Sequence, residues 1–488
     1  MPQGQAGHPR QRIPMLSGGM VSAFPVTVLE EEQGLTRLLK NMDFTRIPGV
    51  VHKRPGLEET DLPEAPEEIK GLTMVLYHGA PVYVIAYDDK VAWAEPGDSS
   101  WTEIQPSEWD SPEADRVNFA TMGGQLIVTD GTNPPFVWNF LGDKGSGGEK
   151  LDNMPKSKYI VEHRNRLFIG GIDGDPLKVK VSHWGDPDGW EVGAVGSQAI
   201  ELFPGNDQRV TGLLAMDDAV LIGQDRSLHV LTGTTSQDFA MYPLDRNVGV
   251  GSHRAAKFID GRAFFPDQRG EVFILEQGAM PENISHPIED YLREVNPDRI
   301  EEASAIVVDK ANYVLTLPEG EEDYITVVYD VVEHRWRLWD TFARFTCEAV
   351  DPLGAYFVLR DTPKKITRLV QGKLEDYDGK PIEARLETLE MHFGAPELEK
   401  EIRTLFFGYW QTGDGADIDL FFRTNMGDWR KIGQTFRVPE GNYGDYLRVQ
   451  VPINDLGRNV QFAFENNKAG EDLRLLDAVI SFIPKEME

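Results

Sequence analysis

The sequence predicts an all-β protein, built as a β-propeller of six or seven blades followed by a second, β-sandwich-like domain. Short runs of alternating apolar and polar residues, separated by Gly, Asp, Asn or Pro, recur along the chain. This is the pattern of antiparallel strands joined by turns. The runs return as strand–turn–strand units with a period of roughly 45–55 residues. A few short strands cannot bury both faces alone, whereas units packed radially can, so the period indicates propeller blades.

The repeated units share one form, a strand, a polar turn and a second strand. They lie at Met74–Ala86 with Val91–Trp93, Asn118–Asn139, His163–Gly171, Asp217–Gly233, Ile259–Leu275, Asp309–Leu317 with Tyr324–Trp339, and Gly354–Leu369. Trp336 and Trp339 are expected to pack between blades rather than to stack on a ligand, because aromatic side chains supply much of the packing area of a β core.

Two short helices and one domain boundary are predicted. A helix is expected at His286–Val295, with Pro287 near its start, and another near Glu30–Asn41. The turn-rich stretch Asp376–Pro381 marks the end of the propeller. Longer alternating runs follow, and these indicate a sandwich: Ile382–Leu386, Arg403–Trp410, Asp417–Arg423, Tyr446–Val451, Val460–Phe464 and Leu473–Ile483. The predicted parts are residues 1–70, a lead-in arm on the C-terminal domain, 71–375, the propeller, and 376–488, the sandwich.

The charge of the chain is strongly negative. The 80 Asp and Glu residues exceed the 49 Lys and Arg residues, which gives a formal net charge of −31 over 488 residues. Capture of nucleic acid by phosphate neutralisation needs clustered basic residues, so it is not expected. A passive DNA conduit has the opposite requirement, because an acidic wall keeps DNA from adhering. Acidity that serves solubility alone remains the other interpretation.

Cysteine content and hydropathy indicate whether the chain could contain disulfides, a secretion signal or a membrane span. Cys347 is the only cysteine, which excludes an intramolecular disulfide, and we expect it to be a small core residue. Residues 1–15 are polar and lack the apolar run of a secretion signal. No stretch approaches about 18 consecutive apolar residues, so no membrane span is predicted.

No catalytic, cofactor-binding or metal-binding residues are predicted, and the chain is not expected to be an enzyme. It contains no Gly-x-x-x-x-Gly-Lys-Ser/Thr loop, no Gly-x-Ser-x-Gly elbow and no paired spacing of His or Cys ligands. The histidines stand singly: His163, His183, His229, His253, His286, His334 and His392. A propeller glycosidase or polysaccharide-binding module remains the alternative, because its paired carboxylates could come from any blade.

Two acidic stretches have both a structural and a functional interpretation. Asp414, Asp417 and Asp419 could offer oxygen ligands to calcium, but their spacing favours a turn before a strand. The stretch Glu58–Glu68, with Pro63 and Pro66, is typical of a solvated linker; the less favoured interpretation is a charged wall element.

Three features together resemble the tail hub or nozzle proteins of short-tailed bacteriophages, also called packaged-DNA stabilisation proteins. The first is the opening segment Asp43–Gly56, which ends in basic residues and Pro-Gly. The second is the blade Tyr159–Ile169 followed by Ser182-His-Trp-Gly-Asp-Pro-Asp-Gly-Trp190. The third is the order of parts, a propeller and then a β-domain that opens at Ile402-Arg403 and closes the chain.

The resemblance implies a structural virion protein without catalytic residues or cofactors. It implies a homo-oligomeric ring, expected to be a hexamer, that continues the DNA channel below the portal and adaptor. The C-terminal domain would form the ring, and other partners would be tail fibres or tailspikes and the tail needle or plug proteins. Such a protein assembles in the host cytoplasm, resides in the virion tail, helps to retain packaged DNA and conducts it during ejection.

Overall fold

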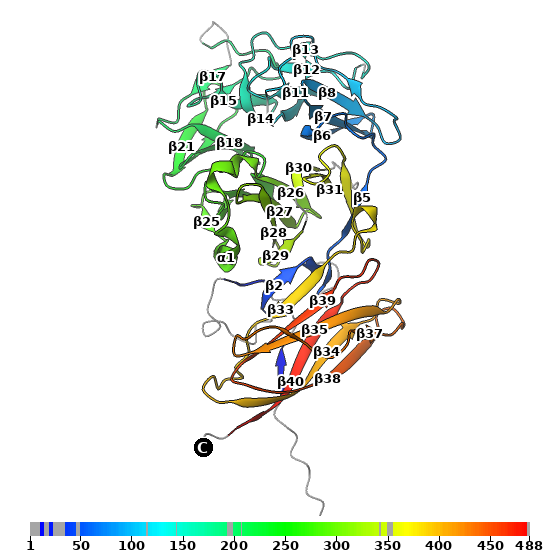
Figure 1. Ribbon diagram of the computed structural model, residues 1–488. Helices are drawn as coiled ribbons and strands as arrows, with labels where there is room; N and C mark the ends of the chain where they lie inside the picture. Colours follow the sequence, from blue (N-terminus) through cyan, green and yellow to red (C-terminus); the bar gives the residue numbers. More distant parts are fainter. Residues whose placement is uncertain are drawn as a thin grey trace, which may run out of the picture.

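The computed structural model describes residues 10–13, 19–22, 35–44, 49–113, 116–142, 144–192, 199–205, 207–340, 343–348 and 355–485. In these ranges the strands form seven antiparallel four-stranded blades and a two-sheet sandwich. Figure 1 shows the propeller above the sandwich, with β2 and β33 between them. The predicted all-β fold, a propeller with a second sandwich-like domain, is therefore confirmed.

The first five blades follow one another along the chain and each consists of consecutive strands. Blade 1 has β6–β9 (Ile69–Tyr77, Ala80–Tyr87, Lys90–Ala94, Thr102–Glu103), and blade 2 has β10–β13 (Asn118–Met122, Gln125–Thr129, Phe136–Trp138, Glu149–Lys150). Blade 3 has β14–β17 (Ser157–His163, Arg166–Ile172, Val179–Val181, Ile200–Leu202), and blade 4 has β18–β21 (Val210–Ala215, Ala219–Gln224, Leu228–Thr232, Ala240–Asp245). Blade 5 has β22–β25 (Lys257–Ile259, Arg262–Pro266, Val272–Glu276, Glu282–Asn283).

The last two blades recruit strands from the start of the chain. Blade 6 has β26–β29 (Ser304–Val308, Asn312–Glu319, Asp323–Asp330, Arg335–Trp339), and β2 (Thr36–Lys40) pairs in parallel with β29. Blade 7 has β30–β32 (Ala343–Glu348, Ala355–Leu359, Thr367–Val370), and β5 (Gly56–Glu59) is its outermost strand. The antiparallel β32–β5 pair closes the propeller by joining its last blade to the segment that precedes its first.

Large apolar side chains fill the spaces between neighbouring blades. Trp93 from blade 1 stacks on Trp138 from blade 2 with ring centroids 6.2 Å apart. Trp336 and Trp339 from blade 6 are both 2% exposed; Trp336 shares a buried cluster with Phe264 of blade 5, and Trp339 shares one with Phe357 of blade 7. Aromatic rings bury large areas, so they hold adjacent blades face to face.

The sandwich consists of two facing sheets around one apolar core. One sheet has the order β1-β40-β34-β38, and the other has β2-β33-β39-β35-β36, with β37 also paired to β35. Their bounds are Arg10–Ile13 (β1), Ala384–Thr388 (β33), Lys400–Trp410 (β34), Ala416–Thr424 (β35), Arg430–Lys431 (β36), Phe436–Val438 (β37), Tyr446–Gly457 (β38), Val460–Asn466 (β39) and Leu475–Pro484 (β40). The six strands predicted after the domain boundary are confirmed, with β36 and β37 as short additions.

The two domains share a sheet and a buried ion pair. Because β2 pairs with both β29 and β33, blade 6 and one sandwich sheet form a single ten-stranded sheet. The guanidinium of Arg54, 1% exposed, binds the Asp376 carboxylate at 2.6 Å and the Asn41 amide oxygen at 2.9 Å. One buried cluster also spans the sandwich and blades 5 and 6. The domains are thus joined by backbone, charge and apolar packing.

Several expectations about the N-terminal part and the helices differ from the structure. Residues 36–40 form strand β2 rather than the end of a helix, because their backbone pairs with two distant strands; residues 30–34 lie outside the described ranges. Residues 1–70 were expected to pack on the C-terminal domain. Strands β1 and β2 do so, whereas β5 belongs to the propeller, and β3 (Met42–Asp43) and β4 (His52–Lys53) pair with each other.

Helix in the described chain is limited to short turns. The helix expected at His286–Val295 is a 3-10 turn, η3 (His286–Ile288), and one α-helical turn, α1 (Glu289–Leu292); η4 (Pro297–Glu302) and η5 (Tyr377–Gly379) are also 3-10 turns. Over the described ranges, no helix is long and apolar enough to cross a membrane. Cys347 lies in β30, but its side chain falls outside what the structure describes.

Candidate functional site

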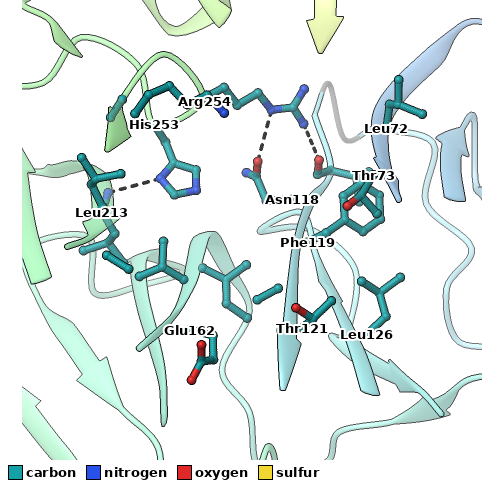
Figure 2. Close-up of a pocket in the computed structure, with 18 of the residues that line it drawn as sticks. Leu72, Thr73, Asn118, Phe119, Thr121, Leu126, Glu162, Leu213, His253 and Arg254 are labelled. Carbon is teal, nitrogen blue, oxygen red and sulfur yellow. Dashed lines mark hydrogen bonds between the residues drawn. The ribbon is translucent and has the colours of Figure 1, made fainter. Parts of the chain in front are cut away.

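The propeller encloses a cavity at the centre of its ring of blades. The innermost strands β6, β10, β14 and β18 and the segment around β22 surround a volume of about 510 Å³. Figure 2 shows its mixed lining, which includes Leu72, Phe119 and Leu126 as well as the hydroxyl of Thr121 and the carboxylate of Glu162. The volume is in the range of small-ligand pockets, about 300–1,000 Å³.

Arg254 crosses from the lead-in of blade 5 to blades 1 and 2. Its Nε donates to the Asn118 side-chain oxygen at 3.2 Å, and its Nη2 donates to the Lys70 carbonyl at 3.2 Å and to the Val117 carbonyl. Figure 2 shows the side chain reaching over Asn118. Burial lowers the pKa of the Arg254 guanidinium well below its usual value, and the charge of Arg116 adds to this effect. The guanidinium thereby ties non-adjacent blades together across the centre.

His253, next to Arg254, is fixed as a neutral acceptor. The N–H of Leu213 in blade 4 donates to its Nδ1 at 3.2 Å, and its ring lies 5.2 Å from that of Tyr159 in blade 3. Burial, together with the charges of Arg254 and Lys257, lowers its pKa to about 3. The ring therefore remains uncharged near neutral pH and acts as a hydrogen-bonded link between blades.

A second cavity of about 660 Å³ lies on the other side of Arg254. Arg299 holds the Glu302 carboxylate through two contacts, Nη2 to Oε2 at 2.7 Å and Nε to Oε1 at 3.0 Å. The Tyr324 hydroxyl donates to the same Oε2 at 2.6 Å, and Arg116 donates to the Glu302 carbonyl at 3.1 Å. These contacts connect η4 to β28 and to the loop before β10.

The pKa shifts of Glu302 and Tyr324 in this second cluster favour a structural role for their contacts. Burial acts to raise the pKa of Glu302, but hydrogen bonds from Arg299 and Tyr324 outweigh it and the pKa falls below its usual value. Burial, with the bond to Glu302, raises the pKa of Tyr324. A glycosidase general acid needs a raised carboxyl pKa, and a tyrosine nucleophile needs a readily lost proton. The pKa of Glu302 is lowered and that of Tyr324 is raised, so each shift is opposite to the one that these catalytic roles require.

The histidines considered in the sequence are dispersed over the fold. His163 lies in β14 of blade 3, His229 in β20 of blade 4, and His334 beside Tyr329 in the β28–β29 turn. Burial lowers the pKa of both His163 and His229. Among the described residues, no group of three His, Cys, Asp or Glu side chains could hold a metal ion.

The two acidic stretches form ion pairs. Asp417 binds Arg437 at 3.0 Å and Asp419 binds Lys431 at 2.7 Å, while Asp414 is exposed in the preceding turn. The other stretch is not a linker along its whole length. Its first residues belong to strand β5, where Glu58 pairs with Arg368 of the adjacent strand. The linker interpretation is therefore wrong for this part, because β5 supplies the outer edge of blade 7.

Sequence reasoning did not find Arg254 or the Arg299–Glu302–Tyr324 cluster. Both depend on contacts between different blades, and each residue stands in an unremarkable polar context along the chain. The one available signal was position, since Arg254 lies between two predicted strand units.

No family model matches the chain, and no curated protein matches it. Among solved structures, the chain is similar to one described as YCF48 bound to D1 peptide, with 9% sequence identity and a TM-score of 0.41. That similarity covers 65% of this chain and 97% of the other.

Proposed function

We propose that this chain is a structural protein of a short-tailed bacteriophage tail hub or nozzle. Copies of it would form a ring, expected to be a hexamer, that continues the DNA channel below the portal and adaptor. It would help to retain packaged DNA and conduct it during ejection, without catalysing a reaction. The observation that carries the proposal is the order of parts, a propeller followed by a sandwich and joined to it as one body, in a chain of net charge −31.

The segments that resemble the family have structural roles that suit this proposal. In the opening segment Asp43–Gly56, of which residues 45–48 are not described, Arg54 binds Asp376 at the domain junction. In the loop after β16, the Trp190 indole donates to the Pro187 carbonyl at 2.7 Å and packs into the blade core, while Trp184 is 62% exposed. One segment contributes a buried ion pair at the domain junction, and the other forms a propeller loop that Trp190 anchors in the blade core.

The interior of the propeller also bears on where DNA could pass. Its cavities, of about 510 and 660 Å³, are the size of small-molecule pockets, and Arg254 crosses between them. The major groove of duplex DNA alone is about 12 Å wide. A passage for DNA would therefore have to be formed between copies, as in a ring, rather than through one propeller.

The charge suits a conduit of this kind. Copies arranged around an axis multiply the negative potential of each chain. Such a wall repels the phosphate backbone, which binds proteins by displacing its counterions with basic groups. The free protein should accordingly fail to retard duplex DNA at low ionic strength, and clear retardation would count against the conduit.

The deciding experiment is electron microscopy of the full-length protein mixed with the portal and adaptor of the same particle. We expect rings seated on the distal end of that complex. A protein that stays monomeric, never joins the complex and cleaves or binds a glycan would overturn the proposal in favour of the glycosidase or polysaccharide-binding alternative. Glycan cleavage is measured on the same preparation, so one sample addresses both outcomes.

A further inference from the structure

The second cavity of the propeller is lined by polar side chains throughout. Every residue around its volume of about 660 Å³ carries a polar or charged side chain, whereas the lining of the first cavity includes Leu72, Phe119 and Leu126. These residues come from the loop before β10, the turn after β11, β14, the segment before β22, η4 and β28. The volume lies in the range of small-ligand pockets, about 300–1,000 Å³, and such a lining suits a ligand whose own groups are polar.

Tyr159 of β14 brings a hydroxyl to this cavity. The residue is 9% exposed, and no group that the structure describes forms a hydrogen bond with its hydroxyl. Other buried tyrosines have such a partner: the Tyr313 hydroxyl donates to the Ala255 carbonyl at 2.6 Å, and the Tyr409 hydroxyl donates to a backbone carbonyl at 2.9 Å. Because a buried tyrosine hydroxyl usually finds a partner, that of Tyr159 is available to a molecule in the cavity.

The electrostatic surroundings of Tyr159 show which way its hydroxyl faces. Burial raises the pKa of the hydroxyl, Glu301 raises it further, and Arg116 is among the charges that lower it. Glu301 and Arg116 both line the second cavity, so the hydroxyl faces the same space. It keeps its proton near neutral pH and can donate a hydrogen bond to an anionic oxygen.

Two half-buried guanidiniums share this part of the cavity. Arg254 Nε donates to the Asn118 side-chain oxygen at 3.2 Å, and Arg116 Nη2 donates to the Glu302 carbonyl at 3.1 Å. Both acceptors are uncharged, so these bonds orient the guanidiniums without neutralising them. Burial lowers the pKa of Arg254 and the charge of Arg116 lowers it further, which places the two groups within electrostatic reach. We call Tyr159, Arg116 and Arg254 the floor; together they suit a carboxylate.

The opening of the cavity has the opposite charge. Exposed side chains that line a cavity stand at its opening, and three of them are carboxylates without an ion pair among the described residues: Glu113, Asp298 and Glu301. Lys158 is an exposed cation of the same lining, so negative charge is in excess there.

The remaining charged groups of the lining are bonded within the protein. Arg299 Nη2 binds the Glu302 carboxylate at 2.7 Å, and the Asp130 carboxylate accepts from the backbone N–H groups of Thr132 and Asn133, each at 2.7 Å. A ligand therefore meets carboxylates at the opening and guanidiniums at the floor. A simple anion is repelled by the first and a simple cation by the second.

We propose that the second cavity binds a small zwitterion, an amino acid or a related molecule with one carboxylate and one ammonium group. The carboxylate lies against the floor and accepts a hydrogen bond from the Tyr159 hydroxyl. The ammonium group lies at the opening, beside Glu301. This inference goes beyond the proposed tail-hub function and does not depend on it, because the cavity lies within one propeller.

The test compares three probes of equal chain length on the full-length protein. They are δ-aminovalerate, which carries both charges, valerate, which carries only the carboxylate, and pentylammonium, which carries only the cation. Saturation-transfer NMR measures their binding, because it detects weak ligands. We expect δ-aminovalerate to bind at least about fivefold more tightly than either of the others, since each of these lacks one charged contact.

Two variants assign the contacts. Y159F removes only the hydroxyl, which has no protein partner to lose, and should weaken δ-aminovalerate about fivefold or more. The matched control Y242F removes a hydroxyl from an exposed tyrosine of β21 and should leave binding unchanged. E301Q removes one carboxylate from the opening and should reduce the preference for δ-aminovalerate over valerate.

Hydrogen exchange locates the ligand without any variant. In the wild type, δ-aminovalerate should slow exchange at residues 298–302 of η4, which contribute to the lining. No binding of δ-aminovalerate, equal binding of the three probes, or binding without protection of η4 would overturn the inference. Y159F that binds like Y242F would overturn it as well. None of these results involves the portal, so they leave the proposed function to its own experiment.

Discussion

The sheets of the propeller and of the sandwich differ in the length of their edge strands. Blades 1, 2 and 5 end in outer strands of two residues, β9, β13 and β25, which consist of Thr, Glu, Lys and Asn. The sandwich ends instead in β38, with twelve residues. Short polar edges offer little to pair with, whereas a long edge must be protected or used. Among the described residues, every outer strand of a blade is shorter than β38; the longest, β21 (Ala240–Asp245), has six residues and contains Pro243, which cannot donate a backbone hydrogen bond.

The two domains also differ in how their cores are divided. In the propeller, separate apolar clusters lie between pairs of blades, such as the one that joins Trp93 to Trp138. The sandwich has one core, which continues into blades 5 and 6. A defect in a blade interface can remain local, while a defect in the sandwich core reaches the junction with the propeller. The following predictions test these differences, from the largest expected effect to the smallest.

Substitution F407A should destabilise the protein most. Phe407 is 0% exposed in β34 and packs edge-on against Phe464 of the facing sheet at 5.3 Å. Truncating a buried phenylalanine typically costs about 3–5 kcal/mol of unfolding free energy, and both sheets of the sandwich lose the contact. Urea unfolding monitored by fluorescence measures this loss of unfolding free energy. A cost below about 1 kcal/mol would contradict a single continuous core.

Substitution D376N should cost about 3 kcal/mol of unfolding free energy by leaving Arg54 buried without its carboxylate. The matched control is the double variant R54M/D376N, which removes both charges and keeps an apolar chain in the space of Arg54. We expect it to recover much of the loss, as seen when buried ion pairs are replaced by apolar residues. Thermal unfolding of the three proteins checks the order. Equal stability of both variants would argue against a buried ion pair at the junction.

Substitution R254M should cost about 1–3 kcal/mol of unfolding free energy, because the carbonyls of Lys70 and Val117 lose their donor in the propeller centre. The control R226M changes an exposed arginine of the same propeller. Hydrogen exchange should rise in blades 1 and 2 of R254M while β38 is unchanged. Faster exchange spread over the sandwich would show that the two domains do not respond separately.

Lys53 should make the stability of the junction depend on pH. Its side chain is 0% exposed, and burial lowers its pKa to about 8 in spite of nearby Asp472 and Glu471. Between about pH 8 and pH 10.5 the unfolded state holds the proton and the folded state does not. The unfolding free energy therefore rises with pH in this window, by up to about 1.4 kcal/mol per pH unit from Lys53. Below about pH 8, Lys53 is protonated in both states and makes no pH-dependent contribution.

Urea unfolding of the wild type and of K53M at several pH values isolates this contribution. Tyrosines whose pKa is raised by burial lower the stability at high pH, but they do so equally in both proteins. The stability of the wild type relative to K53M should therefore increase from pH 8 to pH 10. A constant difference across that range would show that Lys53 keeps an ordinary pKa.

Substitution R448E should change the unfolding free energy by less than about 0.5 kcal/mol, because the side chain is exposed and forms no ion pair among the described residues. Differential scanning fluorimetry checks this expectation. A large change would show that Arg448 stabilises the sandwich itself.

Prediction from sequence succeeded where the signal was local. The alternating run Arg403–Trp410 is strand β34, because period-two burial shows in any window of that length. The turn-rich stretch Asp376–Pro381 lies between β32 of blade 7 and β33 of the sandwich. The prediction near Glu30–Asn41 was wrong for residues 36–40, because β2 is held by β29 and β33, hundreds of residues away, which no local window contains.

The candidate site was less predictable for the same reason. Arg254 has three acceptors in blades 1 and 2, and nothing in the adjacent sequence indicates which carbonyls it will meet. The tie of Arg54 to Asp376 likewise joins residues 322 positions apart. Polar side chains of this kind are placed by the closing of the ring and by the docking of the sandwich.

The sequence by itself determined the strand content, the repeated blade unit and the acidity of the chain, because each depends on composition or on neighbouring residues. Tertiary structure alone decided that β5 completes blade 7, that β2 joins the domains, that Arg254 crosses the propeller centre and that β38 is the last strand of its sheet among the described residues. The physical reason is that a strand's partner and a buried charge's counterpart are set by which distant surfaces meet. Local propensity does not encode that choice.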